Sequence, residues 1–124
     1  MVVVFEGGKG SLLVTELVEN INFNDSCVNK IEFFYKIVVM NIDLCMWKQK
    51  GYQEGDSELR EVDIIFSDVT NYNWISDKNE ENVDYDEIIE IKVKNNDIEI
   101  ILKDEEVSVL SFRCGEVQLN YVTT

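Results

Sequence analysis

Regular alternation of apolar and polar residues in the last third of the chain constrains the fold more than any other feature. Ile89, Ile91 and Val93 alternate with charged residues until Asn95-Asn96-Asp97 interrupts them, and the alternation then resumes. A period of two residues is typical of a β-strand, and Asn and Asp are turn formers. The pattern predicts an antiparallel meander of four short strands, over residues 89–94, 98–103, 107–114 and 117–121.

The rest of the chain must supply the strands that cover the apolar face of this meander. Residues 59–66 alternate clearly, with Val62, Ile64 and Phe66 on one face. Between residues 30 and 47 the apolar parity switches near Val38, which requires two strands or one bent strand, because a strand cannot change faces without a break or bulge. Further short strands are predicted over residues 1–5, before a glycine turn at 7–10, and over residues 72–74.

The segment 11–21 leaves two alternatives open. Leu13, Leu17 and Ile21 have helical spacing, with Ser11 as a candidate N-cap, whereas the valines between them fit either period. We therefore predict an all-β or mainly β fold, with one short N-terminal helix as an option. The predicted architecture is a single domain over residues 1–124, an antiparallel sandwich or open barrel of about eight strands.

Composition places the chain among globular domains. Hydrophobic residues make up 45% and charged residues 29%, and no run of about 18 apolar residues is present. The apolar N-terminus leads directly into Glu6 and a glycine turn, unlike a signal peptide, so we expect a cytoplasmic location. Cys27, Cys45 and Cys114 are expected to be reduced, mostly buried thiols, with one disulfide plus a spare thiol as the alternative.

The formal charge of −14 is distributed unevenly along the chain. Residues 1–50 hold six acids and five lysines, whereas residues 51–124 hold 19 acids and six bases. Such a surface repels nucleic acid and anionic membranes and attracts basic partners. We therefore expect no direct nucleic-acid binding and no membrane binding. The acidity itself is explained equally well by solubility alone.

No catalytic, metal or cofactor site is predicted. The absence of histidine excludes the common zinc sites and any Ser or Cys nucleophile paired with an imidazole base. An EF-hand register that begins at Asp77 has Asn82 in place of the glycine and Ile88 in place of the bidentate glutamate. Pairs of carboxylates carry little information in a chain with 25 acids.

Three stretches, Asn24–Val28, Val62–Val69 and Ser111–Cys114, resemble in layout the small β-rich immunity proteins of bacterial polymorphic toxin systems, in particular the immunity protein fifty family. The resemblance covers about residues 20–122. It implies a fold dominated by antiparallel strands and a role in binding and neutralising a cognate toxin. Related sequences often have His-Asp-Ser where this chain has Asn24-Asp25-Ser26, so no role that needs the imidazole carries over.

The leading hypothesis is a non-catalytic immunity protein that binds a basic protein toxin. The expected toxin is a nuclease, because a nuclease must be basic to hold a phosphate backbone. The alternative is a nucleic-acid mimic or regulatory module that acts on a DNA-binding protein, and an enzyme is the third hypothesis. We expect a monomer or homodimer. The residues predicted to bind the partner are Glu54, Asp56, Glu58, Trp74, Asp77, Glu80, Glu81, Asp84, Tyr85 and Asp86, with Trp74 and Tyr85 as apolar anchors.

Overall fold

The computed structural model describes residues 14–76, 79 and 82–122. They form a mainly β fold, as the alternation predicted. The predicted strand at residues 1–5, the glycine turn after it and the candidate N-cap Ser11 lie outside the described residues. In chain order the elements are α1 (Val14–Asn20), β1 (Cys27–Phe34), β2 (Ile37–Cys45), the 3-10 helix η2 (Met46–Lys48), β3 (Leu59–Ser67), β4 (Thr70–Ile75), β5 (Asp86–Lys94), β6 (Asp97–Lys103), β7 (Val107–Arg113) and β8 (Glu116–Tyr121).

All eight strands belong to one antiparallel sheet, in the order β4-β7-β6-β5-β1-β2-β3-β8. The predicted four-strand meander is correct for β5, β6 and β7 and wrong for β8, which pairs with β3. The reason lies in the short connection after β7. There the Gly115 amide donates a 2.9 Å hydrogen bond to the Ser67 carbonyl at the end of β3, which directs the chain away from β7 and along β3.

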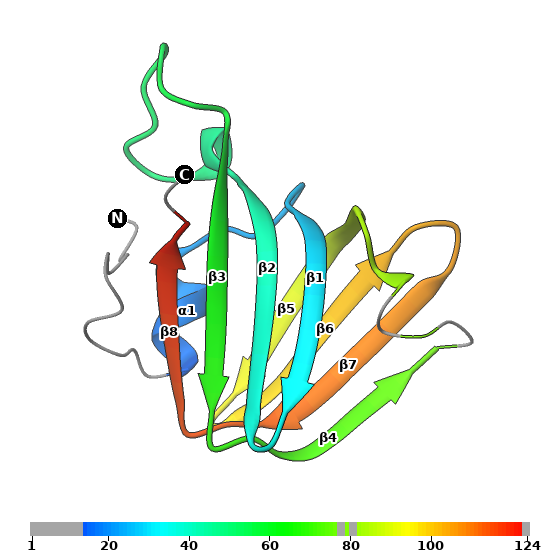
Figure 1. The fold of residues 1–124 in the computed structure, drawn as a ribbon. Helices are drawn as coiled ribbons and strands as arrows, with labels where there is room; N and C mark the ends of the chain where they lie inside the picture. The colour runs from blue at the N-terminus through cyan, green and yellow to red at the C-terminus, as the bar shows by residue number, and fades with distance from the viewer. Residues whose placement is uncertain (1–13, 77–78, 80–81, 123–124) are drawn as a thin grey trace.

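The sheet folds back on itself as an open barrel with two leaves (Figure 1). The front leaf is β8-β3-β2-β1 and the back leaf is β5-β6-β7-β4. β1 and β5 join the leaves through only two register pairs, Cys27 with Glu87 and Val28 with Asp86. On the other side, β3 continues into β4 and β7 into β8, so one two-stranded ribbon bends from leaf to leaf. At the bend, a Cβ on Gly115 would lie 3.1 Å from the Asp68 carboxylate, which leaves little room for a side chain.

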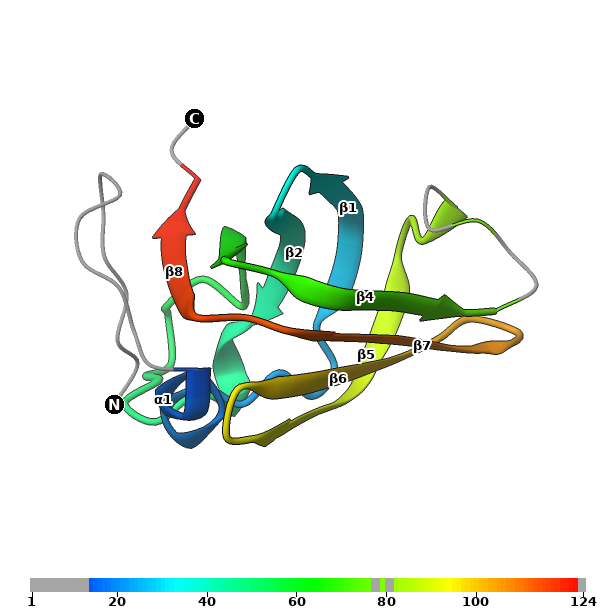
Figure 2. The ribbon, with the colours of Figure 1, turned by 90° about the horizontal axis from the view of Figure 1, so that it is seen from below.

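The core lies between the leaves and is closed on one side by the helix. Val62, Ile64 and Phe66 are fully buried, as predicted for β3. For the described part of the segment 11–21, α1 decides the alternative in favour of a helix. Val14 and Leu17 are buried, and the helix packs against β5 and β8 on the open side between the leaves (Figure 2).

Two strands explain the switch of parity between residues 30 and 47. β1 and β2 form a hairpin in which Phe34 pairs with Ile37, so Tyr35 and Lys36 form a two-residue turn. On β2, Val38 and the alternate residues after it face the core, whereas Ile37 points outward.

β5 departs from the predicted parity. A bulge between Ile88 and Glu90 adds one residue to the strand, and an extra residue turns the following side chains to the opposite face. Ile88 is consequently buried, while Ile89 is 41% exposed. The prediction that Ile89 shares a face with Ile91 and Val93 was therefore wrong.

Candidate functional site

The connections between strands carry very different charge at the two ends of the barrel. At one end, the acidic end, the connections are residues 21–26, 46–58, 76–85 and 104–106. Their described residues include eight carboxylates and two lysines. At the other end, the hairpin end, the connections are residues 35–36, 68–69, 95–96 and 114–115. These hold one lysine, Lys36, and one carboxylate, Asp68.

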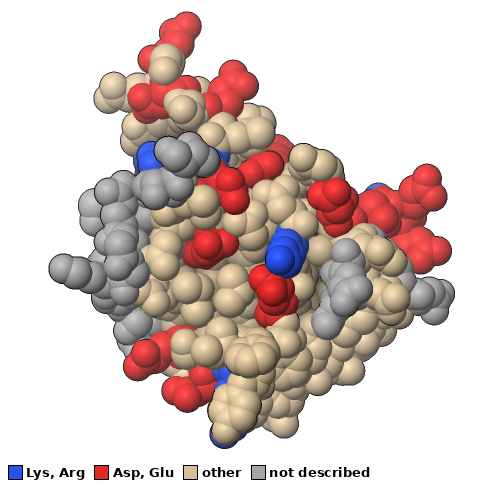
Figure 3. All heavy atoms as spheres, viewed as in Figure 1, with Lys and Arg blue, Asp and Glu red and all other residues tan. Residues whose placement is uncertain are grey.

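The space-filling view agrees with this distribution. In Figure 3 the red carboxylates are prominent over the upper rim, where the β2–β3 connection lies, and along the right-hand edge. At the lower left of the same face red carboxylates occur together with blue side chains, and the lower right is largely free of charge. The negative charge of this chain therefore has a direction in the folded molecule, which the sequence showed only as a difference between two halves of the chain.

The predicted partner-binding residues fall mainly at the acidic end. Glu54, Asp56 and Glu58 are exposed in the β2–β3 connection. Asp84 and Tyr85 are exposed just before β5, and the Tyr85 side chain is 68% accessible. Asp77, Glu80 and Glu81 lie outside the described residues.

Two of the predicted residues are not displayed as expected. Asp86 is the first residue of β5 and is almost completely buried, because it pairs with Val28 at the junction of the leaves. Trp74 is half-buried and packs against the core, since it faces inward opposite Leu110. Neither residue is an exposed contact point, and Tyr85 is the better placed of the two predicted anchors.

A cluster of polar side chains on the outer face of the front leaf holds three further carboxylates. The Asn29 amide donates to Asn41 Oδ1 (2.9 Å) and to Asp43 Oδ1 (3.1 Å). The Asn41 amide donates to Glu61 Oε2 and Asp63 Oδ1, both at 2.8 Å. We call these five residues the amide–carboxylate cluster. Neutral amides fix the carboxylates in place without cancelling their charge.

Cys27 lies beside this cluster, and the pKa of its thiol reflects the charges around it. In the sheet register it stands between Glu87 on β5 and Asp43 on β2. Burial raises the pKa of the Cys27 thiol, and the carboxylates of Glu87, Asp43, Asp25 and Asp86 raise it further. Negative neighbours disfavour the thiolate, so the raised pKa reflects a concentration of negative charge around this position.

Sequence reasoning missed the amide–carboxylate cluster. Asp43, Glu61 and Asp63 alternate with buried residues and so could be placed on the outer face of their strands. Their proximity depends on the pairing of β2 with β3, where Asp43 lies opposite Glu61. Their proximity could be predicted only from the correct register of β2 and β3. Like charges at opposite positions are normally disfavoured, so the charge pattern alone would not have suggested this pairing.

Buried polar residues tie the connections of the acidic end to the body of the barrel. Gln49 accepts a hydrogen bond from the Asn22 amide (3.0 Å) and donates to the carbonyls of Asn22 (2.6 Å) and Cys45 (2.8 Å). The buried Ser26 hydroxyl accepts a 2.9 Å hydrogen bond from the Cys45 amide. The start of the long β2–β3 connection is therefore ordered, although its carboxylates are exposed.

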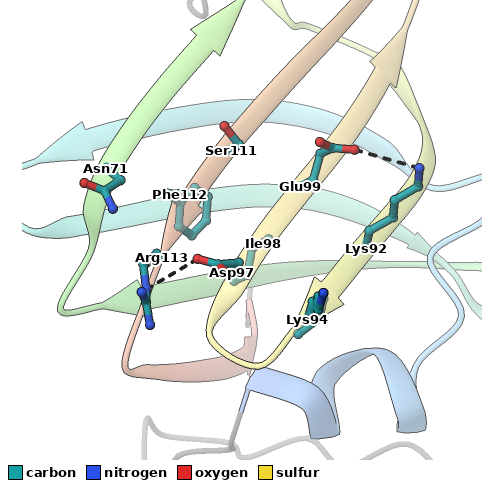
Figure 4. A pocket seen from close by; sticks show the side chains of 10 residues that line it. Asn71, Lys92, Lys94, Asp97, Ile98, Glu99, Ser111, Phe112 and Arg113 are labelled. Atoms are coloured by element: carbon teal, nitrogen blue, oxygen red, sulfur yellow. Dashed lines mark ion pairs between the residues drawn. The ribbon is translucent and has the colours of Figure 1, made fainter.

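The outer face of the back leaf contains a hollow of about 400 Å³ (Figure 4). Charges of alternating sign surround it. Lys92 lies 3.9 Å from Glu99, and Arg113 lies 3.3 Å from Asp97. Each carboxylate has a cation beside it, so the arrangement is a ladder of cross-strand ion pairs rather than two carboxylates converging on a substrate.

The other thiols lie away from these surfaces. Cys45 and Cys114 are buried, all three cysteines are free, and burial raises the pKa of Cys114 to about 12. Within residues 14–76, 79 and 82–122, no group of three or more Cys, Asp or Glu side chains is placed to hold a metal ion. In the same part of the chain, no helix has the length and apolarity needed to cross a membrane.

Comparison with known proteins gave no match among protein-family models, curated proteins or solved structures.

Proposed function

We propose that this chain is a non-catalytic immunity protein that binds and neutralises a basic protein toxin, with a nuclease as the expected class of toxin. The observation that carries the proposal is the concentration of carboxylates at one end of the barrel, with near neutrality at the other. A uniformly acidic surface would serve solubility equally well. A directed charge additionally orients an approaching basic partner and speeds its association.

The amide–carboxylate cluster supports the same proposal. Its hydrogen bonds hold three carboxylates in fixed positions, so less side-chain entropy is lost when a cationic partner binds. The exposed carboxylates of the β2–β3 connection extend the acidic surface from this cluster to the tip of the barrel. Tyr85 supplies an exposed aromatic ring of the kind that is enriched at binding hot spots.

The resemblance to the immunity protein fifty family supports the same proposal. The mainly antiparallel fold is the one that this resemblance implies. Membership of the family and neutralisation of a toxin are parts of the proposal. A nucleic-acid mimic would use the same acidic end, and it would differ in its target, a DNA-binding protein without toxin activity.

Two variants with equal changes of net charge test the proposal. The first, Glu54→Gln/Glu58→Gln/Asp84→Asn, removes three charges from the acidic end, and the second, Asp68→Asn/Asp97→Asn/Glu116→Gln, removes three at or near the hairpin end. The binding probe is the basic protein that this chain captures from its native host in a pull-down, taken as the candidate toxin, and the association rate constant is measured at about 50 mM and about 500 mM salt. We expect the first variant to associate about tenfold more slowly at low salt and the second to change little.

Equal slowing in both variants would show that net charge alone matters, which would contradict an acidic binding surface. Neutralisation is tested separately by co-expression with the toxin gene. If this chain does not restore growth, or if the bound partner is a DNA-binding regulator rather than a toxin, the proposed immunity function is wrong.

A further inference from the structure

The outer face of the front leaf changes from apolar to acidic along its strands. Toward the hairpin end, Phe34 lies opposite Ile37, and Val39 lies opposite Ile65 of β3. Toward the acidic end, the residue two positions before Ile65 is Asp63, which belongs to the amide–carboxylate cluster. Side chains at paired positions point to the same face, and so do alternate residues along a strand. The four apolar residues and the cluster therefore form one surface, which we call the front-leaf face.

The apolar part of the front-leaf face is accessible to a partner. Phe34 is 78% and Ile37 is 38% exposed, and Val39 and Ile65 are half-buried. Figure 3 shows this side of the molecule, on which uncharged surface and separate carboxylates lie next to each other. Continuous exposed apolar surface is typical of interaction sites, and an apolar centre with a polar rim is the usual composition of a protein–protein interface.

The turn between β1 and β2 adds an exposed aromatic ring to this surface. Tyr35 is 86% exposed, and its backbone has φ 61°, a left-handed conformation that bulky residues adopt at a cost. In the β5–β6 hairpin, which also has a two-residue turn, the left-handed residue is Asn95 (φ 56°), a residue type suited to this conformation. The fold alone would be better served by Asn at position 35. A strained, exposed aromatic residue therefore points to a function for its ring.

The carboxylates of the front-leaf face keep their charge. In the part of the chain that the structure describes, no lysine or arginine forms an ion pair with Asp43, Glu61 or Asp63. Their hydrogen-bond partners are the neutral amides of the cluster. Lys30, on the neighbouring strand β1, lies 3.3 Å from Glu32 and is compensated by it. The face thus carries uncompensated negative charge beside its apolar part, which repels an acidic surface and attracts a basic one.

We infer that the front-leaf face is the surface on which a basic protein partner makes its close contact. The inference rests on the proposed function, in which this partner is a toxin. The matching surface of the partner has an apolar patch, which covers the apolar residues and Tyr35, next to arginine or lysine side chains, which pair with the fixed carboxylates of the cluster. Charge complementarity selects this occupant, because the same carboxylates disfavour a second acidic chain and an anionic membrane.

The front-leaf face and the loop carboxylates of the acidic end have different roles in this complex. The exposed loop carboxylates act over a distance, so they speed the encounter, and salt screens their effect. Apolar side chains and hydrogen-bonded carboxylates act once they are buried in the contact, so they slow dissociation. The association rate constant therefore reports on the loops, and the dissociation rate constant reports on the front-leaf face.

Both rate constants of the full chain are measured against the basic protein captured from the native host. Tyr35→Asn removes the exposed ring and gives the turn a residue suited to its left-handed backbone, so an unchanged or higher melting temperature verifies the fold. We expect dissociation to become about tenfold faster, because the ring is an anchor of the contact. Association at about 50 mM salt should change by less than about twofold, since the charge is unaltered.

Two substitutions in the sheet extend the test, each with a matched control on the back leaf. Ile65→Thr keeps a β-branched side chain and should speed dissociation about fivefold, whereas Ile75→Thr, at an exposed position of β4, should leave it unchanged. Asp63→Asn keeps an acceptor for Asn41 and should speed dissociation about tenfold. Asp97→Asn, on β6, should have little effect on dissociation.

The outcomes separate this inference from the proposed function. Unchanged dissociation in Tyr35→Asn and Ile65→Thr would overturn the inference, and the immunity function would stand if the chain still restored growth in the co-expression experiment. Faster dissociation from a captured partner that is a DNA-binding regulator would support the front-leaf face and contradict immunity. Equal acceleration by the front-leaf variants and by their back-leaf controls would overturn the inference, and so would a chain that captures no basic protein.

Discussion

The two ends of the barrel differ in how much chain they use and in what that chain carries. Every connection at the hairpin end is two residues long, whereas the β2–β3 connection at the acidic end runs from residue 46 to 58. The strands that a two-residue turn joins dictate its backbone geometry, so neither residue of the turn is available for another role. Long connections are free of that constraint, and in this chain they have accumulated carboxylates.

Position in the fold, more than composition, separates structural residues from candidate binding residues in this chain. At the hairpin end Asn95, Gly115 and Asp68 serve the geometry of turns and the bend of the ribbon. Tyr35 is the exception there, because its backbone has φ 61°, a left-handed conformation that bulky side chains disfavour. At the acidic end the buried polar residues hold the connections in place, and the exposed ones face the solvent.

The largest expected effect comes from breaking the support of the acidic end. Gln49→Ala removes three hydrogen bonds, two to partly buried backbone groups of Asn22 and one to the buried carbonyl of Cys45. We expect the free energy of unfolding to fall by about 3 kcal/mol, since each lost hydrogen bond costs about 1 kcal/mol. Urea denaturation followed by tryptophan fluorescence measures the change.

A substitution in the same connection provides the control for Gln49→Ala. Gln53 is exposed, so Gln53→Ala should change the unfolding free energy by less than about 0.5 kcal/mol. If both variants were equally stable, the hydrogen bonds of Gln49 would not be what orders the acidic end.

The next largest effect concerns the thiol at the hairpin end. Burial raises the pKa of Cys114 from 9.0 to about 12 in the folded chain. The unfolded chain releases this proton near pH 9 while the folded chain retains it, so stability is lost as the pH rises from 9 towards 12. The expected slope from this group is about 1 kcal/mol per pH unit.

Cys114→Ala tests that slope. The variant should lose less stability than the parent between pH 9 and pH 11, by about 1–2 kcal/mol, measured by thermal unfolding across this range. Any cavity cost of the substitution is the same at each pH and cancels in the comparison. Parallel pH profiles would show that the thiol ionises in the folded chain as readily as in the unfolded one.

The smallest effect concerns the thiol at the acidic end. The pKa of Cys27 is raised by burial and by nearby carboxylates, of which Glu87 and Asp43 contribute most. Glu87→Gln should lower this pKa and increase the thiolate fraction at pH 8, so that alkylation by iodoacetamide speeds up about threefold. The rate is read for Cys27 by peptide mass spectrometry.

The control for this experiment is again at the opposite end. Burial is the main cause of the raised pKa of Cys114, so its alkylation should not respond to Glu87→Gln. An unchanged Cys27 rate would mean that the carboxylates around it are neutralised in solution, which would weaken the case for an acidic surface.

The sequence predicted the strands well and their arrangement only in part. Alternation identified β3, β6 and β7, because one face of each is buried and the other is exposed. It failed at β5, where the bulge after Ile88 shifts the parity, and at β8, where pairing with β3 depends on contacts distant in the chain. Local pattern cannot report either event, since both are decided by the packing of the whole sheet.

For the candidate site, the sequence located the exposed carboxylates and missed how they are organised. The loop acids from Glu54 to Glu58 were identified from composition and turn signals. Asp86 was included because it follows the exposed residues Asp84 and Tyr85, but its own position is buried at the junction of the leaves. The exposure of Phe34 and Tyr35 was not predicted, because they belong to an apolar run and their exposure follows from the position of the turn.

The pairing of β8 with β3 also bears on how the chain is made. During synthesis β3 leaves the ribosome well before β8, because four strands lie between them in the chain. Until β8 arrives, one edge of β3 has no strand partner, and an open edge of this kind can pair with other nascent chains. Its charged outer residues, Glu61 and Asp63, would then act as early protection against aggregation, long before any partner is met.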